Sequence, residues 1–188
     1  MTSPHKLTVA IVAGAVAFAA ASVLALAAVA GAFDHGRSWQ TGSSCVVPAL
    51  PGTVVDATLI NMGGPMTRDS KGSMMGGMMR LSLDRSTVAA GQVTFLAVNA
   101  GNINHELVVL PLPTDQIVGT RSIGADGKID EAGSLGEASK SCAAGSGSGI
   151  APGASSWVTV TLPAGRYEVV CNLAGHYASG MYAQLVVS

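Results

Sequence analysis

From residue 53 onward, short runs of β-branched and apolar residues alternate with glycine- and proline-containing breaks. The run 157–162 alternates apolar and polar residues and stops at the turn signal Pro163-Ala164-Gly165. Such runs predict short strands joined by turns, with no strongly amphipathic helix between them. We therefore expect an all-β fold, an antiparallel Greek-key β-sandwich of about seven or eight strands. The expected strands cover residues 53–60, 79–83, 92–98, 106–112, 157–162, 167–171 and 182–187.

The N-terminus differs in character, because residues 7–33 form one uncharged run that follows Lys6. A membrane-spanning helix needs about 20 apolar residues, whereas a signal-peptide core needs about 7 to 15. The length favours an uncleaved anchor. The richness in alanine and the small residues at 28–32 leave a cleaved signal peptide open. We expect a hydrophobic helix that exports the rest of the chain in either case, with Lys6 on the cytoplasmic side.

The pattern divides the chain into three parts. Residues 1–33 are the signal peptide or membrane anchor, 34–52 a linker without periodicity, and 53–188 the β-domain. A long polar segment interrupts this domain at 114–153, and we expect short helical or strand segments within it near 127–138.

Composition narrows the possible functions. The formal net charge is −1 and only 11% of residues are charged, so the chain lacks the basic surface that nucleic-acid binding needs. It also contains no phosphate-binding loop, no GxSxG elbow and no HExxH pair. We therefore expect neither a nucleic-acid-binding protein nor one of these enzyme classes.

The spacing Cys171-x4-His176-x4-Met181 places a thiol, an imidazole and a thioether between the last two expected strands. This donor set suits copper, and a trigonal site of two histidines and one cysteine would be completed by His105. Taken singly, each residue is more often an ordinary core or surface residue. Taken together they favour a metal, because the two histidines of the domain are both used, and structural zinc is the rival despite the weakness of Met181 as a zinc ligand.

With these residues the chain resembles the cupredoxins, the small blue copper proteins, and most closely their auracyanin, rusticyanin and sulfocyanin branch. The resemblance covers roughly residues 50–188. It implies a cupredoxin-like sandwich with one type 1 copper, whose weak axial ligand is Met181. In many cupredoxins an asparagine directly after the first histidine braces the ligand loops. Here Asn104 precedes His105 and Glu106 follows it, and either is a candidate for that role.

A second methionine-rich feature spans residues 61–79, where methionines are set among glycines. Thioethers bind Cu(I), so this segment is a candidate secondary copper site. An equally open interpretation is an adaptable surface segment that covers apolar surface near the copper end. The methionines are Met62, Met66, Met74, Met75, Met78 and Met79.

Two cysteines remain once Cys171 is assigned to the metal. In an exported domain, Cys45 and Cys142 are expected to form a disulfide. The alternative is a pair of free, buried thiols that act as small apolar groups.

Three functions compete at this point. We expect a non-enzymatic electron carrier on the extracytoplasmic (periplasmic or exported) face of the cytoplasmic membrane, anchored through 7–33 or secreted. It would dock weakly and transiently with membrane redox complexes near His176, such as a cytochrome-containing donor or a terminal oxidase, through a patch framed by Leu173, Ala174 and Tyr177. The alternative is a copper carrier or chaperone that uses the methionines. A copper enzyme would need further histidines, which the domain lacks.

Overall fold

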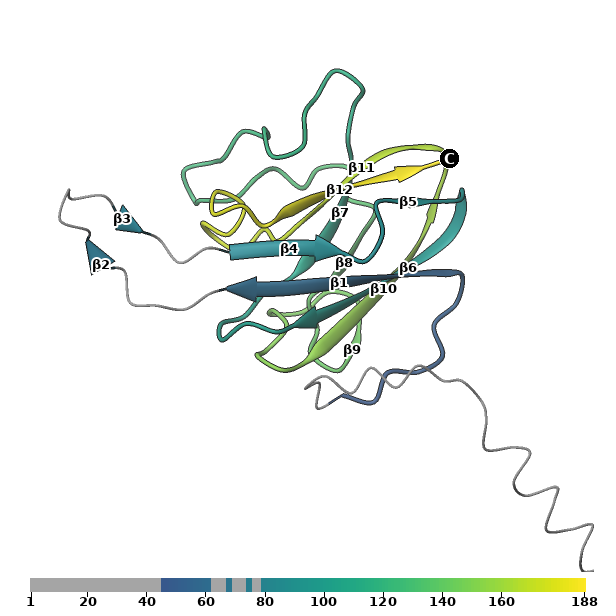
Figure 1. Cartoon of the computed structure of the whole chain (residues 1–188), viewed down its shortest axis with the longest axis horizontal. Coiled ribbons are helices and arrows are strands. Elements are labelled where there is room, and N and C mark those ends of the chain that lie inside the picture. The colour runs from purple at the N-terminus through teal and green to yellow at the C-terminus, as the bar shows by residue number, and fades with distance from the viewer. Residues whose placement is uncertain (1–44, 62–66, 69–73, 76–78) are drawn as a thin grey trace, which may run out of the picture. The chain divides into compact units, whose positions relative to one another are not determined.

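A computed structural model describes residues 45–61, 67–68, 74–75 and 79–188. In these residues the chain forms two five-stranded sheets and one two-stranded sheet, which confirms the all-β fold (Figure 1). The small sheet pairs β2 (Thr67–Arg68) with β3 (Met74–Met75). The described residues contain no helix long and apolar enough to cross a membrane. The helix expected at 7–33 lies outside them.

The first sheet has the strand order β4-β1-β6-β10-β9. Its central pair, β1 and β6, is parallel, with Thr53 opposite Val93 and Leu59 opposite Asn99. The expectation of a wholly antiparallel sandwich is therefore wrong here, because hydrophobic alternation reports which face is buried but not the direction of a neighbour. The strands are β1 (Thr53–Asn61), β4 (Met79–Leu83), β6 (Gly91–Asn99), β9 (Ala143–Ala144) and β10 (Ser155–Leu162).

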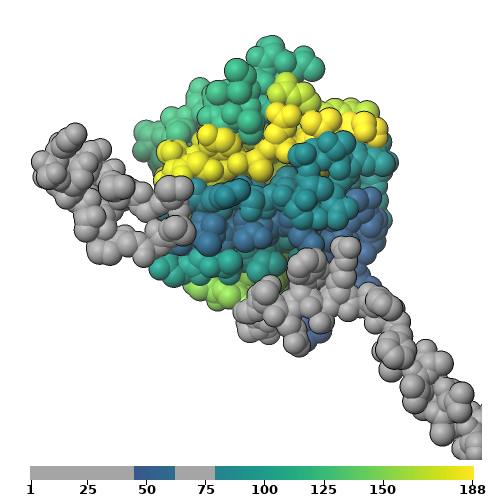
Figure 2. Space-filling model, in the orientation of Figure 1, coloured from purple at the N-terminus to yellow at the C-terminus, as the bar shows by residue number. Residues whose placement is uncertain are grey.

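The second sheet has the order β5-β12-β11-β7-β8. Strand β11 lies at its centre and pairs antiparallel with both β12 and β7. Strands β4 and β12, one from each sheet, run side by side along the face seen in Figures 1 and 2. The strands are β5 (Thr87–Val88), β7 (Leu107–Pro111), β8 (Gly136–Ala138), β11 (Gly165–Val170) and β12 (Tyr182–Val187).

The main core lies between the two sheets. Alternate residues of each strand point into it, and large side chains such as Phe95, Leu59 and Leu185 are fully buried. Complete burial of a side chain of this size stabilises the fold by roughly 1.5 to 3 kcal/mol. This packed core fixes the strand ends, and the strand ends carry the candidate ligands.

The polar 114–153 segment is ordered by strand pairing and by a few buried apolar residues such as Ile129 and Ala138. It contributes β8, which falls within the range 127–138 where short elements were expected. It also contributes β9, which the sequence pattern did not reveal because Ala143–Ala144 shows no alternation. Three isolated bridges add to these contacts, joining His105 to Ile150, Ile123 to Ile129 and Lys140 to Gly149.

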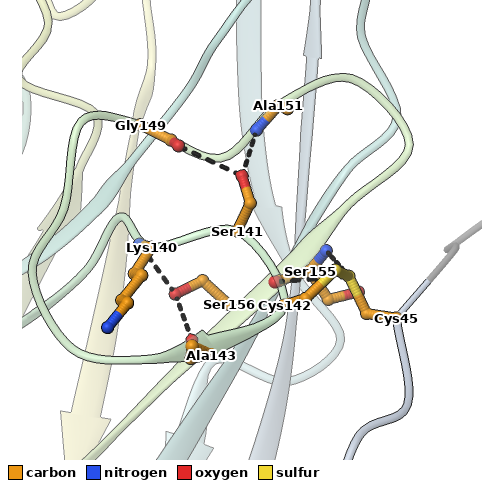
Figure 3. Close-up of a disulfide and its surroundings, with 9 residues drawn as sticks. All are labelled: Cys45, Lys140, Ser141, Cys142, Ala143, Gly149, Ala151, Ser155 and Ser156. Atoms are coloured by element: carbon orange, nitrogen blue, oxygen red, sulfur yellow. Dashed lines mark hydrogen bonds between the residues drawn. A yellow bond between two sulfur atoms is a disulfide. The ribbon is translucent and has the colours of Figure 1, made fainter.

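The expected disulfide is confirmed, with an S–S distance of 2.08 Å between Cys45 and Cys142 (Figure 3). The backbone around Ser155, at the start of β10, holds both cysteines. Its N–H donates to Cys45 Sγ at 3.3 Å, and its carbonyl accepts from the Cys142 N–H at 2.7 Å. Farther along, the Pro51 carbonyl accepts from Thr94 Oγ1 at 2.6 Å. The second part of the expected linker is therefore attached to the sandwich.

Removal of the disulfide should lower the free energy of unfolding, because the crosslink closes a 97-residue separation in the unfolded chain. The chain-entropy model gives at most about 4 to 5 kcal/mol for such a loop. We expect the double variant Cys45→Ser/Cys142→Ser to unfold at lower urea concentration in the metal-free state. A midpoint equal to that of the parent protein would contradict this role.

Candidate metal centre

One loop at the end of the second sheet supplies three of the four predicted ligands. Cys171 directly follows β11, Met181 directly precedes β12, and His176 lies between them. The loop is closed at its base, because the Cys171 N–H donates to the Met181 carbonyl at 3.0 Å. The Met181 N–H in turn donates to the His176 carbonyl at 3.2 Å. Backbone geometry therefore fixes the spacing of all three side chains.

His105 reaches the same place from the start of β7. Its N–H donates to the Ile150 carbonyl at 3.1 Å, and the Ile150 N–H donates back to the His105 carbonyl at 2.6 Å. Strand β7 pairs with β11 so that Val108 faces Val170. His105, two residues before β7, and Cys171, the first residue after β11, therefore lie at the same end of this strand pair.

The structure brings His105, Cys171 and His176 together. The Nδ1 atoms of the two histidines are 3.2 Å apart, and Cys171 Sγ lies 3.3 Å from His176 Nδ1 and 3.9 Å from His105 Nδ1. Sulfur and nitrogen donors at roughly 2.0 to 2.3 Å from one ion stand about 3 to 4 Å from each other. The three atoms therefore have the separation of ligands around a single metal.

The protonation of His105 suits this arrangement. Its Nε2 lies 3.2 Å from Asn61 Oδ1, which is an acceptor, so Nε2 carries the proton and Nδ1 is left bare toward Cys171. Asn61 is held in turn, since the Asn102 N–H donates to the same oxygen at 2.9 Å. Sequence spacing does not reveal this contact, because Asn61 lies 44 positions before His105, at the end of another strand.

Gly101 makes room for this contact. A Cβ atom at this position would lie 2.1 Å from Asn61 Oδ1 and 2.9 Å from His105 Nε2. Any side chain would therefore displace the asparagine or the histidine.

Burial keeps the three donors neutral in the absence of a metal. It raises the pKa of the Cys171 thiol to about 12 and, together with the nearby His176, lowers the pKa of His105 to about 4. Burial also lowers the pKa of His176. A thiolate in such a place needs a cation beside it, and a bound metal would supply that charge and displace the thiol proton. The donor set of one sulfur and two imidazole nitrogens fits copper.

The two candidate bracing residues differ in their surroundings. Asn104 is exposed and lies against Gly149. Glu106 is buried, and its backbone N–H donates to Cys171 Sγ at 3.3 Å. Burial, followed by the carboxylates of Glu137 and Glu131, raises the pKa of the Glu106 carboxyl to about 7. Of the two, Glu106 contacts a ligand directly.

Asn172, directly after Cys171, was not anticipated and makes the side-chain contact expected of a brace. Its Oδ1 accepts from the Ile129 N–H at 2.8 Å, while its Nδ2 donates to the Ile129 carbonyl at 3.0 Å and to Glu131 Oε1 at 2.6 Å. The Gly175 N–H donates to the Gly127 carbonyl at 2.9 Å. These bonds tie the ligand loop to the 114–153 segment, which sequence spacing does not predict.

Met181 is fully buried and packs in the same apolar cluster as Cys171. Its role as the weak axial ligand stays a prediction. His176 is 8% exposed, whereas the other three predicted ligands are fully buried. Leu173 is half-buried and Ala174 exposed, but Tyr177 is only 2% exposed and cannot frame a surface patch.

The methionine-rich segment is only partly described. Met62, Met66 and Met78 lie outside the described residues, and for Met74 and Met75 only the backbone of β3 is described. Met79 begins β4, is half-buried and packs against the main core. Secondary Cu(I) binding by these six residues stays a prediction.

The low pKa of His105 gives the metal-free protein a defined pH dependence. The unfolded chain takes up a proton near pH 6.5 that the folded chain takes up only near pH 4. The contribution of His105 to stability is therefore complete above about pH 6.5 and is lost as the pH falls toward 4, a loss of about 3 kcal/mol.

We test this by comparing urea unfolding of the metal-free parent with that of His105→Gln between pH 7 and pH 4. Glu106 and His176 are present in both proteins, so their titrations largely cancel. The stability of the parent should fall relative to the variant as the pH decreases. If the stabilities of the two proteins change in parallel with pH, burial does not lower the pKa of His105.

Comparison with known proteins identifies the family. The family model described as the sulfocyanin (SoxE) domain matches residues 53–188. A comparison with curated protein sequences finds no significant match.

Several solved structures of blue copper proteins resemble the chain. Reduced auracyanin from Roseiflexus castenholzii is 18% identical, with 74% of this chain and 99% of that chain covered and a TM-score of 0.44. Auracyanin A from Chloroflexus aurantiacus is 17% identical over 72% and 99% of the two chains, with a TM-score of 0.41. Rusticyanin from Thiobacillus ferrooxidans is 20% identical over 78% and 88%, with a TM-score of 0.39.

The family match over residues 53–188 shows the family of this chain. That match covers the whole β-domain, including the three donors that converge at its end. The chain therefore belongs to the sulfocyanin (SoxE) domain family, a branch of the cupredoxins, which hold one type 1 copper and transfer single electrons.

Proposed function

We propose that this protein carries single electrons between redox partners on the extracytoplasmic face of a membrane. The observation that carries the proposal is the approach of Cys171 Sγ to both histidine Nδ1 atoms within 4 Å, at a buried site. His105, Cys171 and His176 would hold the copper, with Met181 as the weak fourth ligand. Bound copper would supply the one-electron couple between Cu(I) and Cu(II).

The contribution of the chain is a frame that changes little when the electron arrives or leaves. The ligand loop is closed by backbone hydrogen bonds, and His105 is held on one side by Ile150 and on the other by Asn61. Side chains that are fixed before the metal binds need little rearrangement between oxidation states, and this favours fast electron transfer.

A copper carrier that uses the methionines is the less supported alternative. A carrier needs to release its metal readily, whereas the three donors here are buried and braced. A copper enzyme would need a second centre. Within the described residues, these three donors are the one group of at least three His, Cys, Asp or Glu side chains placed to hold a metal.

The disulfide supports an extracytoplasmic location, because such bonds persist in oxidising compartments. We propose that residues 7–33 tether the domain to the membrane through the expected linker 34–52. A tether would raise the concentration of the carrier near membrane-bound partners.

We further propose that partners dock weakly at the edge of His176, beside Leu173 and Ala174. In support, His176 is 8% exposed, while His105, Cys171 and Met181 are fully buried. A small contact of this kind suits a transient redox encounter.

The proposal predicts a blue protein. The full chain in detergent, loaded with Cu(II), should show an intense absorption band in the red from charge transfer between thiolate and copper. It should also give a reversible one-electron wave at an electrode. Cys171→Ser should lose both, because a hydroxyl cannot replace the thiolate.

The double variant Cys45→Ser/Cys142→Ser is the matched control, since it removes two other sulfurs and should keep the band. Weak absorption typical of ordinary cupric complexes in the parent protein would overturn the proposed site. A band that survives in Cys171→Ser would do the same.

A further inference from the structure

A second, smaller core lies on the outer face of the second sheet, under the 114–153 segment. It contains Val108, Val170, Ile129 and Tyr177 among its buried residues. Glu168 of β11 is also fully buried, three positions before Cys171. A buried carboxylate is costly unless it is well partnered, so its contacts show what it is there to hold.

The carboxylate of Glu168 has three hydrogen-bond donors. Oε1 accepts from the Gly119 N–H at 2.7 Å and from the Tyr177 hydroxyl at 2.9 Å. Oε2 accepts from Arg121 Nε at 2.6 Å, so the two side chains form an ion pair. The Arg121 side chain is 17% exposed. The charge is therefore neutralised inside the protein rather than by solvent.

Arg121 extends the contacts to the strand that follows His105. Its Nη2 donates to the carbonyl of Pro111, the last residue of β7, at 2.5 Å. Its backbone N–H donates to the Tyr177 hydroxyl at 3.1 Å. One buried ion pair thus joins β7, β11 and the ligand loop, the three segments that carry or adjoin the copper ligands.

Tyr177 links this ion pair to the ligand His176, because it directly follows His176 in the chain. Its ring packs against Tyr182 with the centroids 5.2 Å apart. Its hydroxyl accepts from the Arg121 N–H and donates to Glu168 Oε1. Gly119 lies so close to Tyr182 that a Cβ atom would be 2.3 Å from the ring. The tyrosine is therefore held from its ring and from its hydroxyl.

We propose that Glu168 and Arg121 are positioning residues that fix the His176 imidazole through the hydroxyl of Tyr177. The inference rests on the proposed function, because it concerns the orientation of a copper ligand. A buried ion pair is weak evidence for stability, since apolar residues of similar volume often stabilise as well. Its contribution here is orientation: it limits the conformations of the loop between Cys171 and Met181.

The first test uses Tyr177→Phe, which keeps the ring and removes the hydroxyl. The reporters are amides inside the loop, such as those of Ser179 and Gly180, which donate to the carbonyls of Gly175 and Tyr177. Loss of a hydrogen bond to a charged acceptor should raise their hydrogen-exchange rates in the metal-free protein by on the order of 10- to 100-fold. In the copper-loaded protein, the charge-transfer band and the copper EPR spectrum should shift.

Tyr182→Phe is the matched control. Tyr182 stands in the same aromatic pair, but its hydroxyl has no hydrogen bond to other described residues in the structure. The control should keep the exchange rates of the loop and both spectra of the parent. Equal effects of the two variants, or no effect of Tyr177→Phe, would overturn the proposal.

Glu168→Gln separates positioning from stability. The amide can still accept from Tyr177, but without the negative charge, and it loses the ion pair with Arg121. We expect loop exchange and EPR changes in the same direction as in Tyr177→Phe. If the melting temperature falls while both readouts stay at the parent values, the ion pair is structural only and the proposal is wrong.

The exchange measurement needs no copper, so it separates this inference from the proposed function. A parent protein that fails to become blue would refute the copper site, whatever the loop does. If the parent is blue but Tyr177→Phe leaves the amide exchange rates of the loop unchanged, the proposed electron-carrier function stands and only the positioning role is refuted.

Discussion

The structure is organised around one contact, in which a buried thiol faces two imidazole nitrogens at the end of a β-sandwich. Cys171 Sγ and the Nδ1 atoms of His105 and His176 lie 3.2 to 3.9 Å from one another and are almost completely shielded from water. In that place each donor is neutral without a metal, because burial opposes the charged forms. A bound cation favours the thiolate over the neutral thiol. The assembly of the site and the binding of a metal therefore depend on each other.

The sandwich provides the rigidity that this contact requires. The parallel pairing of β1 with β6 brings Asn61 to the same end of the first sheet as the loop that leads to His105. The antiparallel pairing of β7 with β11 brings the segment before β7, with His105, to the same end as Cys171. Cys171 and Met181 thus adjoin strand ends that the main core already fixes, and the His176 loop is closed between them by backbone hydrogen bonds.

The 114–153 segment gives support from the outside. Its short strands and turns carry polar groups that would otherwise lack partners, and it directs them to the ligand loop: Asn172 bonds to Ile129, and Tyr177 shares the buried carboxylate of Glu168 with Arg121. A long polar loop in a compact domain is unusual unless it has such a task. Here the loop covers the outer face of a sheet and fixes the back of the ligand loop.

Local signals in the sequence predicted several elements correctly. The alternation at 157–162 marks β10, the C-x4-H-x4-M spacing marks the ligand loop, and the two cysteines left over after Cys171 mark the disulfide. The contacts between distant segments are visible only in the folded chain: Asn61 against His105, Asn172 against Ile129 and the parallel β1–β6 pair. Hydrophobic periodicity specifies which face of a strand is buried, whereas the partner of a buried polar atom depends on the register between strands, which is fixed only when the whole core packs.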